Sequence, residues 1–223
     1  MTRVEGGGVE EGIVDPRVRS ALERNDRYVR EFVEAFNLCP YAKRTREAGR
    51  LQREVVLEEG DAALPALSAA IRGFEALPPE TIDVGLLIFP ALPQGIEAAH
   101  AFERMVGTAR EAMQARHAGD PPFYCVPFHP DFAEDLTDEH RAVRFIRRSP
   151  DPTVQLVRAS VLRAVRGSGC TDYIDTSAMS AAELMAVSVP LSVSEKIAQA
   201  NLQTLQGEGP ARLRELLAGI RSR

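Results

Sequence analysis

The run Ile82-Asp-Val-Gly-Leu-Leu-Ile-Phe89 is the most informative segment for the fold. It is almost continuously apolar, and it stops at Pro90. An apolar run of this length is typical of a central β-strand that is covered on both faces. We therefore expect other elements to pack on both sides of the sheet to which this strand belongs.

Further strand and helix patterns lie on either side of this run. Residues 51–57 alternate in polarity, which predicts a strand with one wet face. Residues 123–128 predict a third strand, in which Pro127 favours an edge position or a bulge. Helical periodicity is predicted over residues 26–36 (with Asp26 as N-cap), 62–76, 94–116 and 153–165.

Strands separated by helices of this length favour parallel pairing through right-handed crossovers. The predicted fold class is therefore α/β, with a small, mainly parallel sheet, crossover helices and a helical C-terminal appendage. Residues 1–15, rich in Gly and Glu, are predicted to form a mobile tail before an α/β domain over 16–170. Residues 171–223 are predicted to form a helical extension, packed on the domain or on a second subunit in a homo-oligomer.

The composition is that of an ordinary soluble protein. The chain has 223 residues, 44% of them hydrophobic, and a formal net charge of −5 at pH 7. This acidic excess gives no reason to expect binding to nucleic acid or to an anionic membrane. No stretch has the length and apolarity of a signal peptide or a membrane span. The three cysteines are too scattered for a disulfide framework or a zinc motif, so we expect a cytoplasmic protein with free thiols.

The segment Asn37-Leu-Cys-Pro-Tyr-Ala-Lys43 breaks the helical pattern. Because the residue before a proline avoids the helical region, one helix is predicted to end near Cys39 and a short one to begin at Pro40, with Cys39 as its N-cap. The positive end of the new helix would lower the pKa of the thiol, whereas the negative end of the preceding helix would raise it. Cys39 is then either a reactive thiolate or a small buried apolar residue at a helix junction.

A histidine follows the third predicted strand in Phe128-His-Pro-Asp-Phe132. Ligands of α/β folds gather at the carboxyl ends of parallel strands. The imidazole of His129 could act there as acid, base or metal ligand, with its tautomer fixed by the carboxylate of Asp131. The alternative is a structural turn, since Pro-Asp is ordinary turn chemistry.

The segment Arg147-Arg-Ser-Pro-Asp-Pro-Thr153 precedes the last predicted helix of the domain. Its two arginines could bind a carboxylate or phosphate at that helix N-terminus, together with Arg158 further along. The alternative is a capped surface helix whose arginines pair with Asp138 and Glu139. Asp151 favours this alternative if its own charge occupies the cap.

Taken in order, NLCPYAKR (37–44), FHPDF (128–132) and RSPDPTVQLVR (148–158) resemble an uncharacterised bacterial family, domain of unknown function 1415. The resemblance spans about residues 27–205 and is strong in the first two segments. In the third, this chain has Asp151, Gln155 and Ala159 where the family usually has an aromatic residue, His and Glu, so no role of those residues carries over. The resemblance supports the α/β fold and implies no reaction.

The leading functional hypothesis is an enzyme that acts on a small anionic molecule. Cys39 would be its nucleophile or redox thiol, and His129 its acid or base, oriented by Asp131. The expected substrate-binding residues are Asn37, Lys43, Arg147, Arg148 and Arg158. This hypothesis requires the three segments to open onto one cleft.

Two alternatives stay open. The first is a haem- or metal-binding protein, because Cys39 before Pro40 has the look of a haem-contact dipeptide and His129 could be an opposing ligand. The sequence has no closely spaced set of four metal ligands, so a structural zinc site is not expected. The second is a non-catalytic scaffold or partner-binding domain, in which the same residues are parts of turns and caps.

Overall fold

The computed structural model describes residues 2–4, 15–166 and 193–222. Its centre is a five-stranded sheet in the order β1-β2-β3-β5-β4. The strands are β1 (Thr2–Val4), β2 (Leu51–Val55), β3 (Val84–Ile88), β4 (Phe123–Phe128) and β5 (Thr153–Arg158). β2 and β3 are parallel, β1 is antiparallel to β2, and β5 is antiparallel to both β3 and β4. The sheet is therefore mixed.

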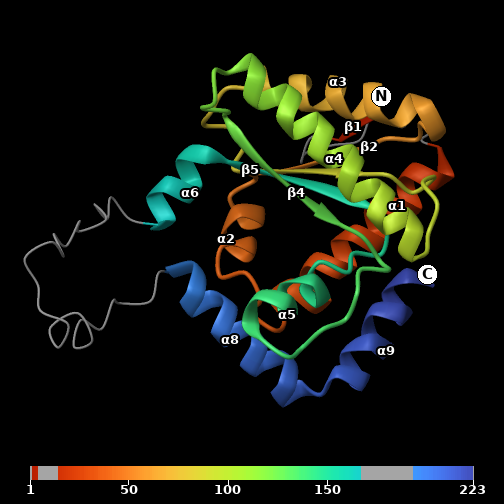
Figure 1. Ribbon diagram of the computed structural model, residues 1–223, viewed down its shortest axis with the longest axis vertical. Coiled ribbons are helices and arrows are strands. Elements are labelled where there is room, and N and C mark those ends of the chain that lie inside the picture. The colour runs from red at the N-terminus through yellow and green to blue at the C-terminus, as the bar shows by residue number, and fades with distance from the viewer. Residues whose placement is uncertain (1, 5–14, 167–192, 223) are drawn as a thin grey trace, which may run out of the picture.

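Helices cover both faces of this sheet, which gives three layers (Figure 1). One face carries α3 (Ala63–Glu75), which follows the 3₁₀ turn η2 (Gly60–Ala62), and α4 (Ile96–Arg116). The other face carries α1 (Pro16–Arg27), the π-helix η1 (Tyr28–Glu34), α2 (Ala42–Glu47), α5 (Glu139–Ile146), α8 (Val193–Glu208) and α9 (Pro210–Arg221). α6 (Ala159–Arg166) continues from the end of β5.

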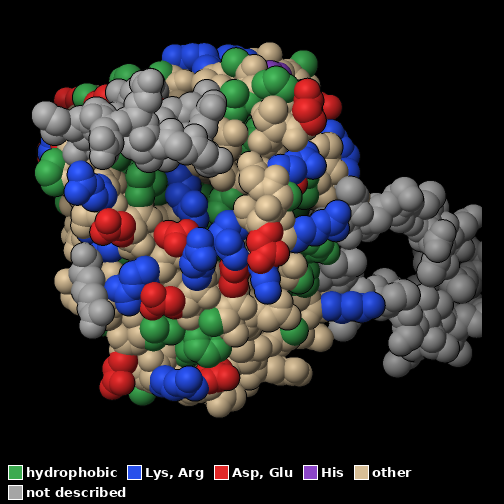
Figure 2. Space-filling model, turned by 180° about the vertical axis from the view of Figure 1, so that it is seen from behind, with side chains coloured by type: hydrophobic (Ala, Val, Ile, Leu, Met, Phe, Trp, Pro, Cys, Tyr) green, Lys and Arg blue, Asp and Glu red, His purple; other side chains and the backbone are tan. Residues whose placement is uncertain are grey.

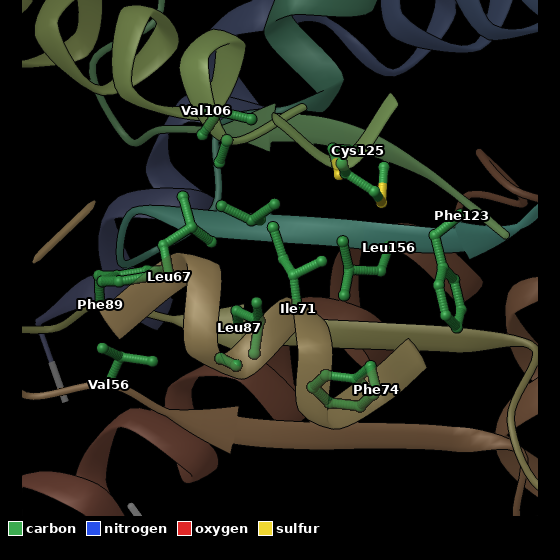
Figure 3. Packing of buried hydrophobic residues seen from close by; sticks show 14 of the residues in the cluster. Val56, Leu67, Ile71, Phe74, Leu87, Phe89, Val106, Phe123, Cys125 and Leu156 are labelled. Carbon is green, nitrogen blue, oxygen red and sulfur yellow. The ribbon is translucent and has the colours of Figure 1, made fainter. Parts of the chain in front are cut away.

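The apolar run 82–89 forms β3 and lies third in the sheet, as predicted. Its buried side chains alternate between two cores: Leu87 packs with α3 and α4, and Ile88 packs on the opposite face. Figure 3 shows the first of these cores, with Leu67, Ile71 and Phe74 of α3 lying over the sheet. Pro127 lies in β4 at the edge of the sheet, as predicted, where a missing N–H can face away from the ladder.

The prediction of a helix over 153–165 is wrong for its first half. Residues 153–158 form β5, and helix α6 begins only at Ala159. Thr153, Val154 and Val157 are β-branched and favour strands. Val154 and Leu156, two residues apart, both point into the same core, and β5 pairs with a strand on each side. Because β5 runs antiparallel between β3 and β4, the prediction of a mainly parallel sheet is also wrong.

The first helix begins ten residues before the predicted N-cap at Asp26. α1 starts at Pro16, and the side chain of Asp15 is its N-cap. Asp-Pro is a helix-start signal, and Val18 and Ala21 extend the buried stripe back to it. At the N-terminus, Thr2–Val4 forms β1 in a region where the sequence predicted a mobile tail.

The two C-terminal helices contribute to the second core. Leu205 of α8 and Leu213 and Ile220 of α9 are fully buried in it, and α8 packs against α5. Within the described residues, no helix is long and apolar enough to cross a membrane. On the face seen in Figure 2, basic and acidic side chains are interspersed rather than separated.

Candidate functional site

An apolar pocket of about 150 Å³ lies between η1, α2 and the sheet. We call it the Cys39 pocket. The three segments singled out in the sequence meet in its wall. The first segment contributes Cys39, Tyr41 and Ala42, the second Phe128, and the third Ser149, Thr153 and Gln155. Tyr28 and Val33 of η1 and Val84 and Leu86 of β3 line much of the rest of its surface, and Asn25 and Thr45 add polar groups.

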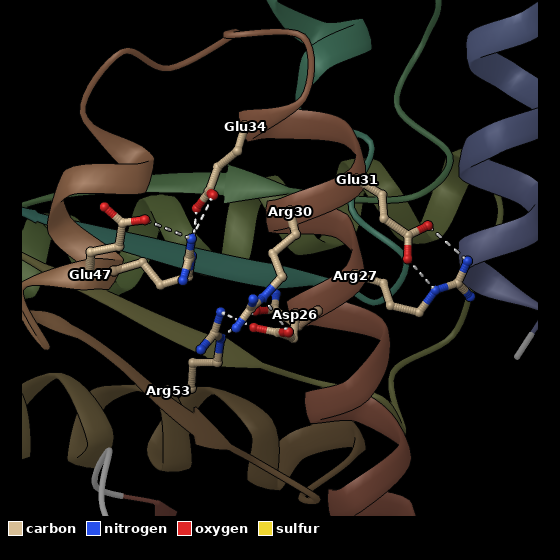
Figure 4. Close-up of polar contacts among 9 residues, drawn as sticks. Asp26, Arg27, Arg30, Glu31, Glu34, Glu47 and Arg53 are labelled. Carbon is tan, nitrogen blue, oxygen red and sulfur yellow. Dashed lines mark hydrogen bonds and ion pairs between the residues drawn. The ribbon is translucent and has the colours of Figure 1, made fainter.

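Ion pairs hold the helical wall of this pocket in place (Figure 4). Nε of Arg46 on α2 lies 2.8 Å from a carboxylate oxygen of Glu34 on η1. On the sheet side, Nε of Arg53 donates to Oδ1 of Asn25 at 2.8 Å. These contacts join α1, η1, α2 and β2 around the pocket. The π-helix has a wider turn than an α-helix, and such turns occur frequently at functional sites.

Cys39 lies in the turn between η1 and α2. This turn is fixed by its backbone: Asn37 adopts a φ of 51°, which Asn tolerates better than most residues, and Nδ2 of Asn201 on α8 donates to the Leu38 carbonyl at 3.0 Å. The prediction that Cys39 is the N-cap of the short helix is wrong, because Tyr41 occupies that position.

The surroundings of Cys39 favour the neutral thiol. Burial raises the pKa of the thiol above its ordinary value. Hydrogen bonds from the backbone N–H groups of Tyr41 and Ala42 favour the thiolate, but they do not outweigh burial. At neutral pH, Cys39 is therefore a thiol in a largely apolar wall rather than an activated thiolate.

His129 is completely buried, between the rings of Phe102 on α4 and Phe132, each with its centroid 5.9 Å from that of the imidazole. Its Nδ1 accepts a hydrogen bond from the backbone N–H of Asp131 at 3.2 Å, so the proton of the neutral ring belongs on Nε2. Nε2 makes no well-aligned hydrogen bond to a described residue, although the Pro93 carbonyl lies near the ring. Burial lowers the pKa of His129, although Asp131 and the Pro93 carbonyl favour the charged ring.

The carboxylate of Asp131 has other partners than the imidazole. It lies 4.0 Å from Nδ1 of His129. One oxygen accepts from the backbone N–H of Gly95 at 2.7 Å, at the start of α4, and the other lies 3.2 Å from Nη1 of Arg221 on α9. The turn after β4 thus joins the beginning of α4 to the end of α9.

The structure does not bring Cys39 and His129 into one pocket. Cys39 lines the pocket beside the π-helix, whereas the His129 ring packs on Phe102 of α4, which belongs to the core on the opposite face of the sheet. Direct proton transfer between the two side chains has no support in this geometry. A haem held between these two side chains would need the same juxtaposition.

The predicted anion-binding residues lie in different places. Arg147 is partly buried beside Tyr28, and Arg148 lines a second pocket with α9. Arg158 lies at the opposite end of β4 from His129, because it pairs with Phe123. Six residues of strand put these two ends about 17 Å apart.

Arg158 has structural partners at that end. Its Nε donates to the Ile82 carbonyl at 2.9 Å, and its guanidinium stacks 4.5 Å from the ring centroid of Phe123. Asn37 and Lys43 are exposed and do not line the Cys39 pocket. The predicted pairing of arginines with Asp138 and Glu139 is replaced, for Arg148, by an ion pair with Glu134 at 3.3 Å.

Sequence reasoning missed several residues that line the two pockets. Tyr28 falls within the predicted helix over residues 26–36, where nothing singles it out, yet its hydroxyl donates to the Ile146 carbonyl at the pocket. Gln155 is the one polar residue within Val154–Val157, which was a detectable signal. Arg214 and Arg221 of α9 lie in the predicted helical extension over residues 171–223, for which the sequence predicts no site residue. Among the described residues, no three His, Cys, Asp or Glu side chains gather in a way that would hold a metal ion.

A comparison with protein families matches residues 20–188 to one described as a protein of unknown function, DUF1415. The chain belongs to this family. The resemblance inferred from the sequence is thereby confirmed, and the DUF1415 match includes all three segments that line the Cys39 pocket. α8 and α9 lie beyond the matched range. Neither the curated proteins nor the solved structures gave a match.

Proposed function

We propose that this protein binds a small molecule with a compact apolar body and one acidic group, and that the body occupies the Cys39 pocket. One observation carries the proposal. Three segments far apart in the sequence, each unlike the periodic elements around it, meet in the wall of a single apolar pocket. Concave apolar sites with a few polar groups are the usual form of small-molecule sites.

The size of the pocket sets the size of the ligand. An apolar cavity of about 150 Å³ accommodates a benzene-sized molecule. Most of the exposed wall is apolar, and several of its polar groups have partners already: the Tyr28 hydroxyl donates to the Ile146 carbonyl, and the Ser149 hydroxyl to the Asp151 carbonyl. A ring or a short branched chain therefore fits this space better than a sugar or a nucleotide does.

Arg147 is the group that would select an acid. It directly follows Ile146 and lies beside Tyr28, and both of these residues line the pocket. Its guanidinium is partly buried, and within the described part of the chain it has no ion pair and no side-chain hydrogen bond. Burial lowers the pKa of Arg147, and the longer-range influence of Tyr28 and Glu103 does not outweigh it. A ligand carboxylate would supply the missing partner.

Cys39 would contact the ligand as a neutral thiol. A nucleophilic cysteine needs a base, and the described side chains that line the pocket include no His, Asp, Glu or Lys. The geometry therefore supports ligand binding better than nucleophilic catalysis by a Cys39–His129 pair. If a reaction takes place here, we expect its base to be carried by the ligand.

The test uses benzoate and the uncharged benzyl alcohol as probes in calorimetry or ligand-detected NMR. Ala42→Leu places a larger side chain in the pocket wall, whereas Ala48→Leu is the matched control, exposed at the end of the same helix. We expect benzoate to bind the wild type and the control variant and to lose about tenfold or more in affinity with Ala42→Leu.

Arg147→Gln distinguishes the contribution of the acidic group to binding from that of the apolar body. It should weaken benzoate about tenfold and leave benzyl alcohol unchanged, because only the acid uses the guanidinium. Circular dichroism controls for folding. Equal benzoate affinity in Ala42→Leu and the wild type would overturn the proposal, as would failure of the folded wild type to bind either probe.

A further inference from the structure

A second pocket, of about 370 Å³, lies where α9 meets two loops of the α/β domain. Its wall includes Pro130 from the turn after β4, Arg148 and Ser149 from the loop before β5, and Arg214, Leu217 and Arg221 from α9. We call it the arginine pocket. None of its three arginines lines the Cys39 pocket.

We propose that the arginine pocket is a binding site for a phosphate group. The charges around it leave a positive excess. Glu134 is shared, with its carboxylate 3.3 Å from Nη1 of Arg148 and 3.2 Å from Nη1 of Arg214. Asp131 pairs with Arg221 at 3.2 Å. Three guanidinium groups thus face two carboxylates, and neither carboxylate lines the pocket itself.

The end of α9 acts against this excess but does not cancel it. Ala218, Arg221 and Ser222 place the C-terminus of α9 at the pocket. A helix C-terminus carries a partial charge of about −0.5. The residual charge of the site is therefore still positive, and the guanidinium groups have to provide the attraction.

The existing ion pairs leave hydrogen-bond donors for an anion. All three are longer than the roughly 2.7–2.9 Å of strong charge-assisted pairs, and longer than the 2.8 Å between Arg24 and Asp151 elsewhere in the chain. A guanidinium has five N–H donors. Nη2 of Arg148 and Nη2 of Arg214 have no hydrogen bond to any described residue. Several donors around one cavity suit an anion with several oxygens, such as phosphate.

The experiment measures the binding of inorganic phosphate by calorimetry at low, matched ionic strength. Arg214→Gln should weaken phosphate about tenfold, because it removes a charged donor from the wall. The matched control is Arg212→Gln, on the same helix, whose partner is Glu208 and which does not line the pocket; it should leave the affinity unchanged.

Glu134→Gln is the decisive variant, because it removes the carboxylate shared by Arg148 and Arg214. A phosphate site should then bind phosphate several times more tightly. If these residues form only an ion-pair network that fastens α9, Glu134→Gln will not tighten phosphate binding and Arg214→Gln will behave like Arg212→Gln. Either result overturns the proposal.

Two further arms identify the ligand chemistry. Acetate should bind more weakly than phosphate, since it has fewer oxygens for the same donors; equal binding would overturn the assignment to phosphate. Glycerol 3-phosphate, measured in the same way, distinguishes a phosphomonoester ligand from inorganic phosphate. The compound that binds more tightly identifies which of the two the site prefers, and either outcome supports a phosphate site. Arg214→Gln should retain benzoate binding in the Cys39 pocket, so this inference and the proposed function can fail separately.

Discussion

His129 is held as a neutral ring by its surroundings. It is completely buried between two phenylalanine rings, its Nδ1 accepts a backbone hydrogen bond, and burial lowers its pKa. The carboxylate that follows it in the sequence binds the start of α4 and Arg221 instead. This residue therefore contributes to stability through packing, and its charge state links stability to pH.

Replacing His129 should change the pH dependence of stability. Below about pH 6.5 the unfolded chain gains a proton on this ring that the folded protein resists, so the wild type should lose stability as the pH falls from about 7.5 to 5.5. His129→Phe should show a smaller loss over the same interval, although it costs about 1 kcal/mol for the missing hydrogen bond. Urea unfolding at the two pH values measures both. An unchanged pH dependence would contradict the burial of a neutral ring.

Residue chemistry could be predicted for some positions and not for others. Cys39 was identified as a residue at a helix break, and it does lie in the turn between η1 and α2. The direction of its pKa shift depends on how deeply the thiol is buried, and the spacing of residues in the sequence does not reveal this. Asp131 was expected to orient the imidazole through its carboxylate, but its backbone N–H does so. Both differences arise from tertiary contacts.

At the scale of elements, β3 and α3 approach each other closely at a glycine. A Cβ placed on Gly85 would lie 3.0 Å from a ring carbon of Phe74, which is completely buried and would have to shift to make room. Gly73, on α3 itself, is exposed and has no atom within 4 Å of such a Cβ. The two positions form a matched pair of glycines.

Alanine substitution should have opposite effects at these two glycines. Gly85→Ala should lower the free energy of unfolding by about 1–3 kcal/mol, because it overpacks the contact between β3 and α3. Gly73→Ala should raise it by about 0.5–1 kcal/mol, because alanine is the better residue in an exposed helix. Urea denaturation of both variants checks the sign. Stabilisation by Gly85→Ala would show that this contact is looser than described.

Elements with a strong local pattern were predictable. The run 82–89 and the long helix over 96–116 follow directly from their apolar spacing. β5 was not predicted, because Pro150 and Pro152 are typical of the start of a helix. The β-branched residues that follow them form a strand of the sheet. Strand order depends on long-range pairing, so the antiparallel insertion of β5 was not evident from spacing.

At the scale of the whole molecule, α8 and α9 are part of the core. Leu205, Leu213 and Ile220 are completely buried with residues of α1, η1 and α5. Asn201 of α8 holds the carbonyl next to Cys39. The C-terminal helices therefore support the turn that forms the wall of the Cys39 pocket.

Truncation of one leucine in α9 should destabilise the whole fold. Leu213→Ala should lower the free energy of unfolding by about 2–5 kcal/mol in a single transition, whereas Glu215→Ala, exposed on the same helix, should stay within about 0.5 kcal/mol of the wild type. Thermal and urea unfolding measure both. A separate early transition for Leu213→Ala would indicate that α9 folds independently of the domain.

The convergence of the three segments was required by the functional hypothesis and is met in part. Cys39, Phe128 and Ser149 line one pocket. His129 directly follows Phe128 in the sequence, and Arg158 lies on the same strand as Gln155, but neither His129 nor Arg158 lines this pocket. In a strand, successive side chains point to opposite faces, so a neighbour along the chain can belong to the other side of the sheet. Contributions from α9 could not be predicted, because they depend on how that helix packs.

Protection of Cys39 from alkylation directly measures whether a ligand occupies the Cys39 pocket. Alkylation by iodoacetamide at about pH 8.5 can be followed at each cysteine by mass spectrometry, since the raised pKa of the Cys39 thiol makes labelling slow at neutral pH. We predict that benzoate slows labelling of Cys39 in the wild type and in Ala48→Leu, and that Arg147→Gln or Ala42→Leu reduces this protection. Labelling of Cys39 at an unchanged rate in saturating benzoate would contradict the assignment of this pocket as the ligand site.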